Sequence, residues 1–222
     1  MKLTGSLVLA IALMAAFASG ANSQVPASVV RKVEGQTLTS PELPAARFYF
    51  ADGFHYLGGQ RFALGGQTDA EQHFFVDAGE RGQIRRLFWI QFEHKMPGNN
   101  GSYNYTTPTV TELGGLSFVY DTKIYTDYPG VKPALGSDVE KARAFLAARG
   151  FFLPRMAIRV RMFHLPGTDK RSELMIIYAQ AMSADQMPKN AGNDMPADDK
   201  YPGLSRALLQ RVQQSLKIQV AR

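Results

Sequence analysis

Residues 156–163, MAIRVRMF, decide the fold, because large apolar side chains occupy every second position and two arginines lie between them. One set of alternating positions is apolar and consists of Met156, Ile158, Val160 and Met162. The other set consists of Ala157, Arg159, Arg161 and Phe163. Successive side chains of an extended chain point to opposite faces, so this pattern predicts a strand with one face against a core and two arginines on the other.

The next hydrophobic segment, residues 173–181 (ELMIIYAQA), is almost continuously apolar. Such a run is typical of a strand that is buried on both faces. Residues 165–170 (LPGTDK) contain proline, glycine and aspartate, which favour a turn. The two segments are therefore predicted to form a β-hairpin.

Further strands and two helices are predicted on either side of this hairpin. Aromatic and β-branched residues indicate strands at 48–50, 54–57, 72–76, 86–93 and 116–120, and the composition allows the last to continue to 125. Ser137 and Glu140 have the spacing of a helix capping box, and Pro202 opens a second helix with Leu204, Leu208, Val212 and Leu216 on one face. The expected fold class is α+β: a mainly antiparallel sheet of about six to seven strands with two helices packed on it.

The N-terminus has the pattern of a cleaved signal peptide. Lys2 precedes an apolar run at residues 7–17, and small residues follow it. The predicted organisation is a signal peptide at 1–23, an extended N-terminal arm at 24–46 and a single α+β domain at 47–222. We therefore expect an exported bacterial protein, either periplasmic or extracellular.

Composition narrows the classes of partner. The formal net charge of +6 is scattered along the chain, and there are no cysteines, so disulfides and lipid attachment through cysteine are excluded. Without a block of like charges, no nucleic-acid binding is expected, and membrane contact is at most peripheral. The four histidines have no metal-ligand spacing, so we predict no metal site and no cofactor. The oligomeric state stays open.

The segment after Phe88 supplies the strongest candidate site. On a strand, Trp89, Gln91, Glu93 and Lys95 project to one side, and this row of an aromatic ring, an amide and two charges suits the wall of a ligand pocket. If the pocket is dry, Glu93 can act as a proton acceptor. The alternative is a polar face of the sheet that is exposed to water.

Two further groups complete the predicted ligand-binding residues. Arg159 and Arg161 can clamp an anion, form an ionic network with Glu93, or cover a surface with their apolar stems. Tyr103 and Tyr105 lie in the long segment 96–112, whose tyrosines and asparagines suit either ligand recognition or a structural crossover.

Three functions are compatible with these patterns. The favoured one is an exported, non-catalytic binding or accessory protein for a small ligand, an envelope polymer or a protein partner. The second is a hydrolase or isomerase that uses Glu93 or His94, with Arg159 and Arg161 as an anion clamp. The third is a structural interaction module without a ligand pocket. The chain has neither a GxSxG elbow nor a phosphate-binding loop, which favours the non-catalytic interpretation.

Overall fold

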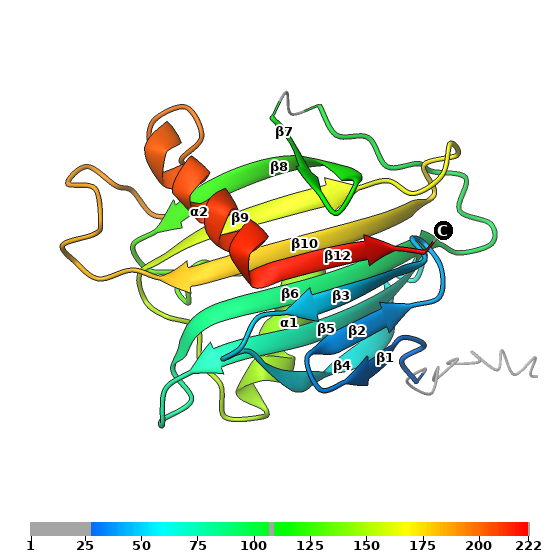
Figure 1. Cartoon of the computed structure of the whole chain (residues 1–222), viewed down its shortest axis with the longest axis horizontal. Helices are drawn as coiled ribbons and strands as arrows, with labels where there is room; N and C mark the ends of the chain where they lie inside the picture. Colours follow the sequence, from blue (N-terminus) through cyan, green and yellow to red (C-terminus); the bar gives the residue numbers. More distant parts are fainter. Residues whose placement is uncertain (1–27, 107–108, 222) are drawn as a thin grey trace, which may run out of the picture.

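The computed structural model describes residues 28–106 and 109–221 (Figure 1). The predicted signal peptide at 1–23 therefore lies outside the described residues. Within them, the chain is mostly antiparallel sheet with two helices, which confirms the predicted α+β class.

The larger sheet has eight strands, not six to seven, and all its strand pairs are antiparallel. Its strands are β4 (His55–Leu64), β5 (Thr68–Ala78), β6 (Ile84–Lys95), β7 (Val110–Leu113), β8 (Leu116–Tyr125), β9 (Ala157–His164), β10 (Ser172–Ala181) and β11 (Met195–Pro196). The order is β11-β8-β9-β10-β6-β5-β4, and β7 pairs with β8 outside this path. The predicted hairpin is present as β9 and β10, which lie at the centre.

A second sheet of four strands was not predicted. Its strands are β1 (Lys32–Glu34), β2 (Thr37–Ser40), β3 (Ala46–Phe50) and β12 (Leu216–Val220), in that order. Two of these strands lie within the segment 24–46, for which an extended arm was expected. The prediction that Leu216 belongs to the final helix was wrong. It begins β12, because residues 216–220 pair with β3 and residues 216–219 alternate in burial.

The helices form where the sequence indicated. Helix α1 (Asp138–Ala147) is capped by Ser137, whose side chain accepts a hydrogen bond from the Glu140 backbone N–H at 3.2 Å. The Glu140 carboxylate accepts in turn from the backbone N–H of Gly136 at 2.6 Å. Helix α2 (Pro202–Ser215) begins at a proline, which fits the first turn because that position needs no N–H donor.

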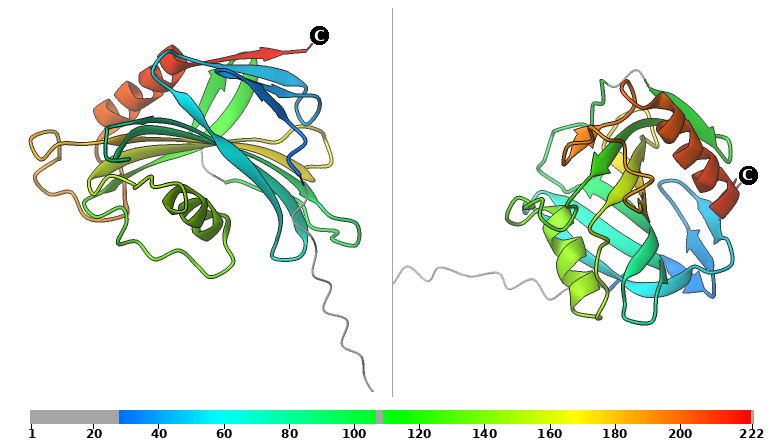
Figure 2. Two further views of the ribbon diagram at one scale, coloured as in Figure 1. Left: turned by 90° about the horizontal axis from the view of Figure 1, so that it is seen from below. Right: turned by 90° about the vertical axis from the view of Figure 1, so that its left-hand side faces the viewer.

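The two faces of the larger sheet pack against different layers, as Figure 2 shows. The smaller sheet and α2 cover one face, where the core includes Phe88, Ile90 and Phe92 of β6. Helix α1 covers the other, where Trp89 packs with Phe145 and Leu146. The alternation along β6 thus separates two cores, and it places the predicted ligand-binding row on the α1 face.

Candidate functional site

The row on β6 is buried. Trp89 is 4% exposed, Gln91 is inaccessible and Glu93 is 9% exposed. The alternative of a polar face open to water is therefore excluded for these three side chains. Lys95, at the end of the strand, is partly exposed.

Hydrogen bonds connect the row into a chain. The indole Nε1 of Trp89 donates to Gln91 Oε1 at 3.0 Å, and Gln91 Nε2 donates to Glu93 Oε1. From β5, Gln72 Nε2 donates to Gln91 Oε1 at 2.7 Å and to the Asp138 backbone carbonyl at 3.1 Å. Sequence reasoning missed Gln72 and Asp138 as members, because only strand pairing and the seating of α1 bring them to Gln91.

A pair of carboxyl groups lies at the end of this chain. Glu173 of β10 is the direct cross-strand partner of Glu93 and is 3% exposed. The Tyr103 hydroxyl donates to Glu93 Oε2 at 2.6 Å, and the Tyr105 hydroxyl donates to Glu173 Oε2. We call Glu93, Glu173, Tyr103 and Tyr105 the acid–tyrosine cluster. Sequence reasoning did not identify Glu173 as a site residue, because the mainly apolar segment that begins with it predicts only a core strand.

Within the described ranges, neither Glu93 nor Glu173 forms an ion pair with a basic side chain. The Lys95 ammonium, the nearest candidate along β6, donates to Thr68 Oγ1 at 3.3 Å and lies 4.0 Å from the centroid of the Tyr103 ring. The carboxyl pair is thus held by hydroxyl and amide donors and not by cations.

Burial controls the protonation of the acid–tyrosine cluster. It raises the pKa of Glu93, although hydrogen bonds from Tyr103 and Gln91 oppose this effect. Burial and then the neighbouring Glu93 charge raise the pKa of Glu173 to about 8. Burial and the hydrogen bond to Glu93 also raise the pKa of Tyr103, so its hydroxyl remains a donor. Near neutral pH the cluster can therefore hold a proton on a carboxyl group.

Arg159 and Arg161 lie on the same face of the larger sheet as Glu93, but they do not meet it. Both guanidinium groups bind Asp121 of β8, with N–O distances of 2.9 Å. Arg161 pairs with Ile177, which is four residues from Glu173, or about 13 Å along a strand. The predicted anion clamp is thus occupied by a carboxylate of the chain itself.

His94 is separated from Glu93 by the alternation of the strand. Its Nδ1 lies 2.8 Å from Ser172 Oγ. Tyr105, by contrast, connects the acid–tyrosine cluster to β9. Its ring stacks on Phe163 of that strand at a centroid distance of 4.1 Å. The structure therefore brings together the predicted residues Trp89, Gln91, Glu93, Tyr103 and Tyr105. It leaves His94, Arg159 and Arg161 outside this group.

A second buried polar cluster lies on the opposite face of the larger sheet. Glu71 accepts hydrogen bonds from the backbone N–H groups of Val30 and Arg31, both at 2.9 Å, and lies 2.7 Å from His73 Nε2. The other ring nitrogen of His73 lies 2.9 Å from the Tyr56 hydroxyl. Burial opposes ionisation of Glu71, but these hydrogen bonds lower its pKa to about 2. This cluster fastens the segment before β1 to the sheet.

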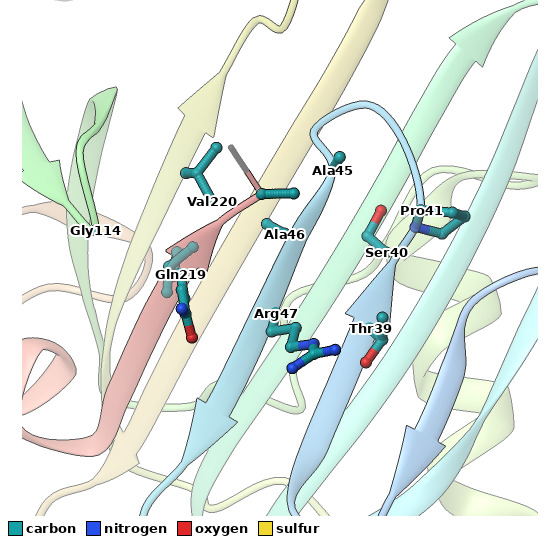
Figure 3. Close-up of a pocket in the computed structure, with 11 residues that line it drawn as sticks. Thr39, Ser40, Pro41, Ala45, Ala46, Arg47, Gly114, Gln219 and Val220 are labelled. Atoms are coloured by element: carbon teal, nitrogen blue, oxygen red, sulfur yellow. The ribbon is translucent and has the colours of Figure 1, made fainter.

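A wide hollow of about 920 Å³ lies elsewhere, along the smaller sheet near the end of β12 (Figure 3). Thr39, Arg47 and Gln219 line it together with small residues such as Ala45 and Ala46. None of the predicted site residues lines this hollow. The hollow therefore lies apart from the acid–tyrosine cluster and is not part of the candidate site.

The described part of the chain contains no group of three or more acidic, histidine or cysteine residues that could hold a metal ion. Neither of its helices is long and apolar enough to cross a membrane. Comparison with protein-family models, curated proteins and solved structures gave no match, so no relative supplies a function for these residues.

Proposed function

We propose that this chain is an exported, non-catalytic binding protein, and that its ligand engages the acid–tyrosine cluster. The proposal of export depends on the leader-like residues 1–23. The observation that carries the binding proposal is the pair of buried carboxyl groups whose hydroxyl donors both come from one long connection. A connection that supplies the partners of a buried site is well placed to exchange them for those of a ligand.

The chemistry of the site favours a ligand that is rich in hydrogen-bond donors. When Tyr103 and Tyr105 move aside, Glu93 and Glu173 each lose a donor, and an unsatisfied buried acceptor costs about 1–3 kcal/mol. Hydroxyl or amine groups of a ligand can replace the tyrosine hydroxyls. The aromatic rings beside the carboxyl groups offer apolar surface for the faces of a sugar ring. An envelope saccharide is therefore the favoured ligand class.

The catalytic alternative has weaker support. It combines Glu93 or His94 with an anion clamp, yet His94 bonds to Ser172 and both arginines bind Asp121. A structural module without a ligand remains the second candidate, because the same hydrogen bonds hold residues 103–105 against the sheet.

Trp89 provides a direct test, because it is the only tryptophan and is hydrogen-bonded to Gln91 within the row. We expect soluble peptidoglycan fragments to change its fluorescence in a saturable manner. Spermidine tests whether amine donors are sufficient for binding when the ligand has no sugar ring. Glu93→Gln should weaken binding about tenfold or more, since a hydrogen bond to a charged group contributes roughly 1.5–3 kcal/mol. Tyr103→Phe should strengthen binding, because its ring gives up no hydrogen bond to Glu93 when the ligand displaces it.

Tyr49→Phe is the matched control. Tyr49 also donates a hydroxyl hydrogen bond, to Gln219 at 3.1 Å, but on the exposed surface of the smaller sheet. Equal affinity of the Tyr103→Phe and Tyr49→Phe variants for the bound fragment would contradict the placement of the site. If none of the probes binds, the structural role of the acid–tyrosine cluster is favoured.

A further inference from the structure

A small apolar pocket lies beside the C-terminal half of α1, apart from the acid–tyrosine cluster. Its volume is about 300 Å³, and its walls include Leu146, Phe151, Phe152 and Leu153. Arg143 is the charged residue that lines it. Pockets that bind small molecules have this composition: mainly apolar walls with a few polar groups that fix the orientation of the ligand.

The positive charge of Arg143 has no carboxylate partner among the described residues. Its guanidinium donates to three backbone carbonyls, those of Pro129 at 3.1 Å, Val131 at 2.5 Å and Tyr128 at 2.9 Å. Its Nε is buried and has no hydrogen-bond partner in the part of the chain that the structure describes. Carbonyl groups orient a guanidinium but do not neutralise it, so both charge and a donor remain unmatched.

The aromatic wall of the pocket is held in place by the backbone. Phe152 is 55% exposed, yet its N–H donates to the Gly82 carbonyl and its carbonyl accepts from the Ile84 N–H, both at 2.9 Å. Gly82 permits this contact, because a Cβ there would lie 2.0 Å from the Gly150 carbonyl oxygen. The backbone is thus fixed at a position where more than half of a large apolar side chain stays exposed.

We propose that this pocket binds a small apolar acid, with the acid group paired to Arg143 and the hydrocarbon part against Leu146, Phe151 and Phe152. Charge complementarity selects an anion over a neutral or cationic amphiphile, because Arg143 is the one charged side chain among the described residues that line the pocket. Its size selects a short chain over a long one. This site is separate from the proposed function and does not depend on it.

Octanoate is a suitable probe, with octan-1-ol and octylammonium as ligands that share its chain but differ in charge. Saturation-transfer NMR on the full exported chain measures the affinity of each below its micelle concentration. We expect octanoate to bind at least tenfold more tightly than the other two. Arg143→Gln should remove this preference for octanoate, and Phe152→Ser should weaken octanoate binding at least fivefold. Leu135→Ser is the matched control, because Leu135 is 93% exposed and does not line the pocket.

The outcomes separate this site from the acid–tyrosine cluster. Tyr103→Phe should leave octanoate affinity unchanged, so a failure of the proposed function leaves this inference intact. Phe152→Ser keeps the test valid if Arg143→Gln does not fold, because the exposed ring is not part of the core. Equal binding of the three probes, no binding of octanoate, or an equal effect of Phe152→Ser and Leu135→Ser would overturn the proposal.

Discussion

Glu93 of β6 lies directly opposite Glu173 of β10, and both carboxyl groups are buried without a cationic partner among the described residues. Like charges opposite each other on neighbouring strands destabilise a sheet. The arrangement is tolerated because Tyr103, Tyr105 and Gln91 donate hydrogen bonds and because the raised pKa of Glu173 allows it to be neutral.

The first prediction concerns the pH dependence of stability. The folded-state pKa of Glu173 is about 8, above the ordinary value of 4.5, so its contribution is fully present below pH 4.5 and is lost as pH rises to 8. Glu173→Gln removes this loss. Relative to the wild type, the variant should gain on the order of a few kcal/mol between pH 4.5 and pH 8. Urea unfolding across this range measures it, with Glu112→Gln, on an exposed position of β7, as control.

If the difference in free energy of unfolding between the Glu173→Gln variant and the wild type does not change between pH 4.5 and pH 8, ionisation of the carboxyl pair does not destabilise the fold. That result would also mean that a proton is not shared within the acid–tyrosine cluster.

The second prediction concerns the attachment of the N-terminal segment. Glu71→Gln should lower the free energy of unfolding by about 3 kcal/mol, because it leaves the buried Arg31 guanidinium without its carboxylate. The contribution of Glu71 is present above pH 4.5 and is lost as pH falls towards 2, since its folded pKa is lowered. Trypsin should cleave the variant after Arg31 or Lys32 faster than it cleaves the wild type. Asp69→Asn, which breaks the more exposed pair with Arg61, should cost no more than about 1 kcal/mol.

The third prediction compares two glycines with positive φ. Gly82→Ala places a Cβ 2.0 Å from the Gly150 carbonyl oxygen, whereas Gly65→Ala meets no atom within 4 Å. We expect a loss of at least about 3 kcal/mol for Gly82→Ala and about 1 kcal/mol for Gly65→Ala, which carries only backbone strain. Thermal unfolding distinguishes the two. Similar losses would indicate that the contact between residues 82 and 150 relaxes easily.

The fourth prediction concerns the arginine pair. Asp121→Asn removes the carboxylate shared by Arg159 and Arg161 and should destabilise the chain by about 2 kcal/mol, because Arg159 is largely buried. Sulfate should then restore more of the melting temperature than chloride at equal ionic strength, since two guanidinium groups on one strand can bind an oxyanion. The wild type should show no such preference. An equal response of the two proteins would mean that the arginines separate when Asp121 is neutralised.

Several local features of the fold were predictable from the sequence. The alternation of residues 156–163, the apolar run at 173–181 and the capping pair Ser137 and Glu140 each depend on side chains that are close along the chain. Their periods follow from backbone geometry, so they indicated a hairpin and a helix correctly. The same reasoning placed Trp89, Gln91 and Glu93 on one face.

Only the tertiary structure decided which of these side chains meet. Glu93 and Glu173 are neighbours through the register of β6 and β10, Asp121 reaches the arginines through the pairing of β8 and β9, and residues 216–220 form a strand through β3. Register depends on contacts between residues distant in sequence, which a local pattern does not encode. The sequence alone therefore determined the strands that frame the site and the faces they present, whereas long-range pairing determined which acid neighbours Glu93 and which carboxylate occupies the arginine pair.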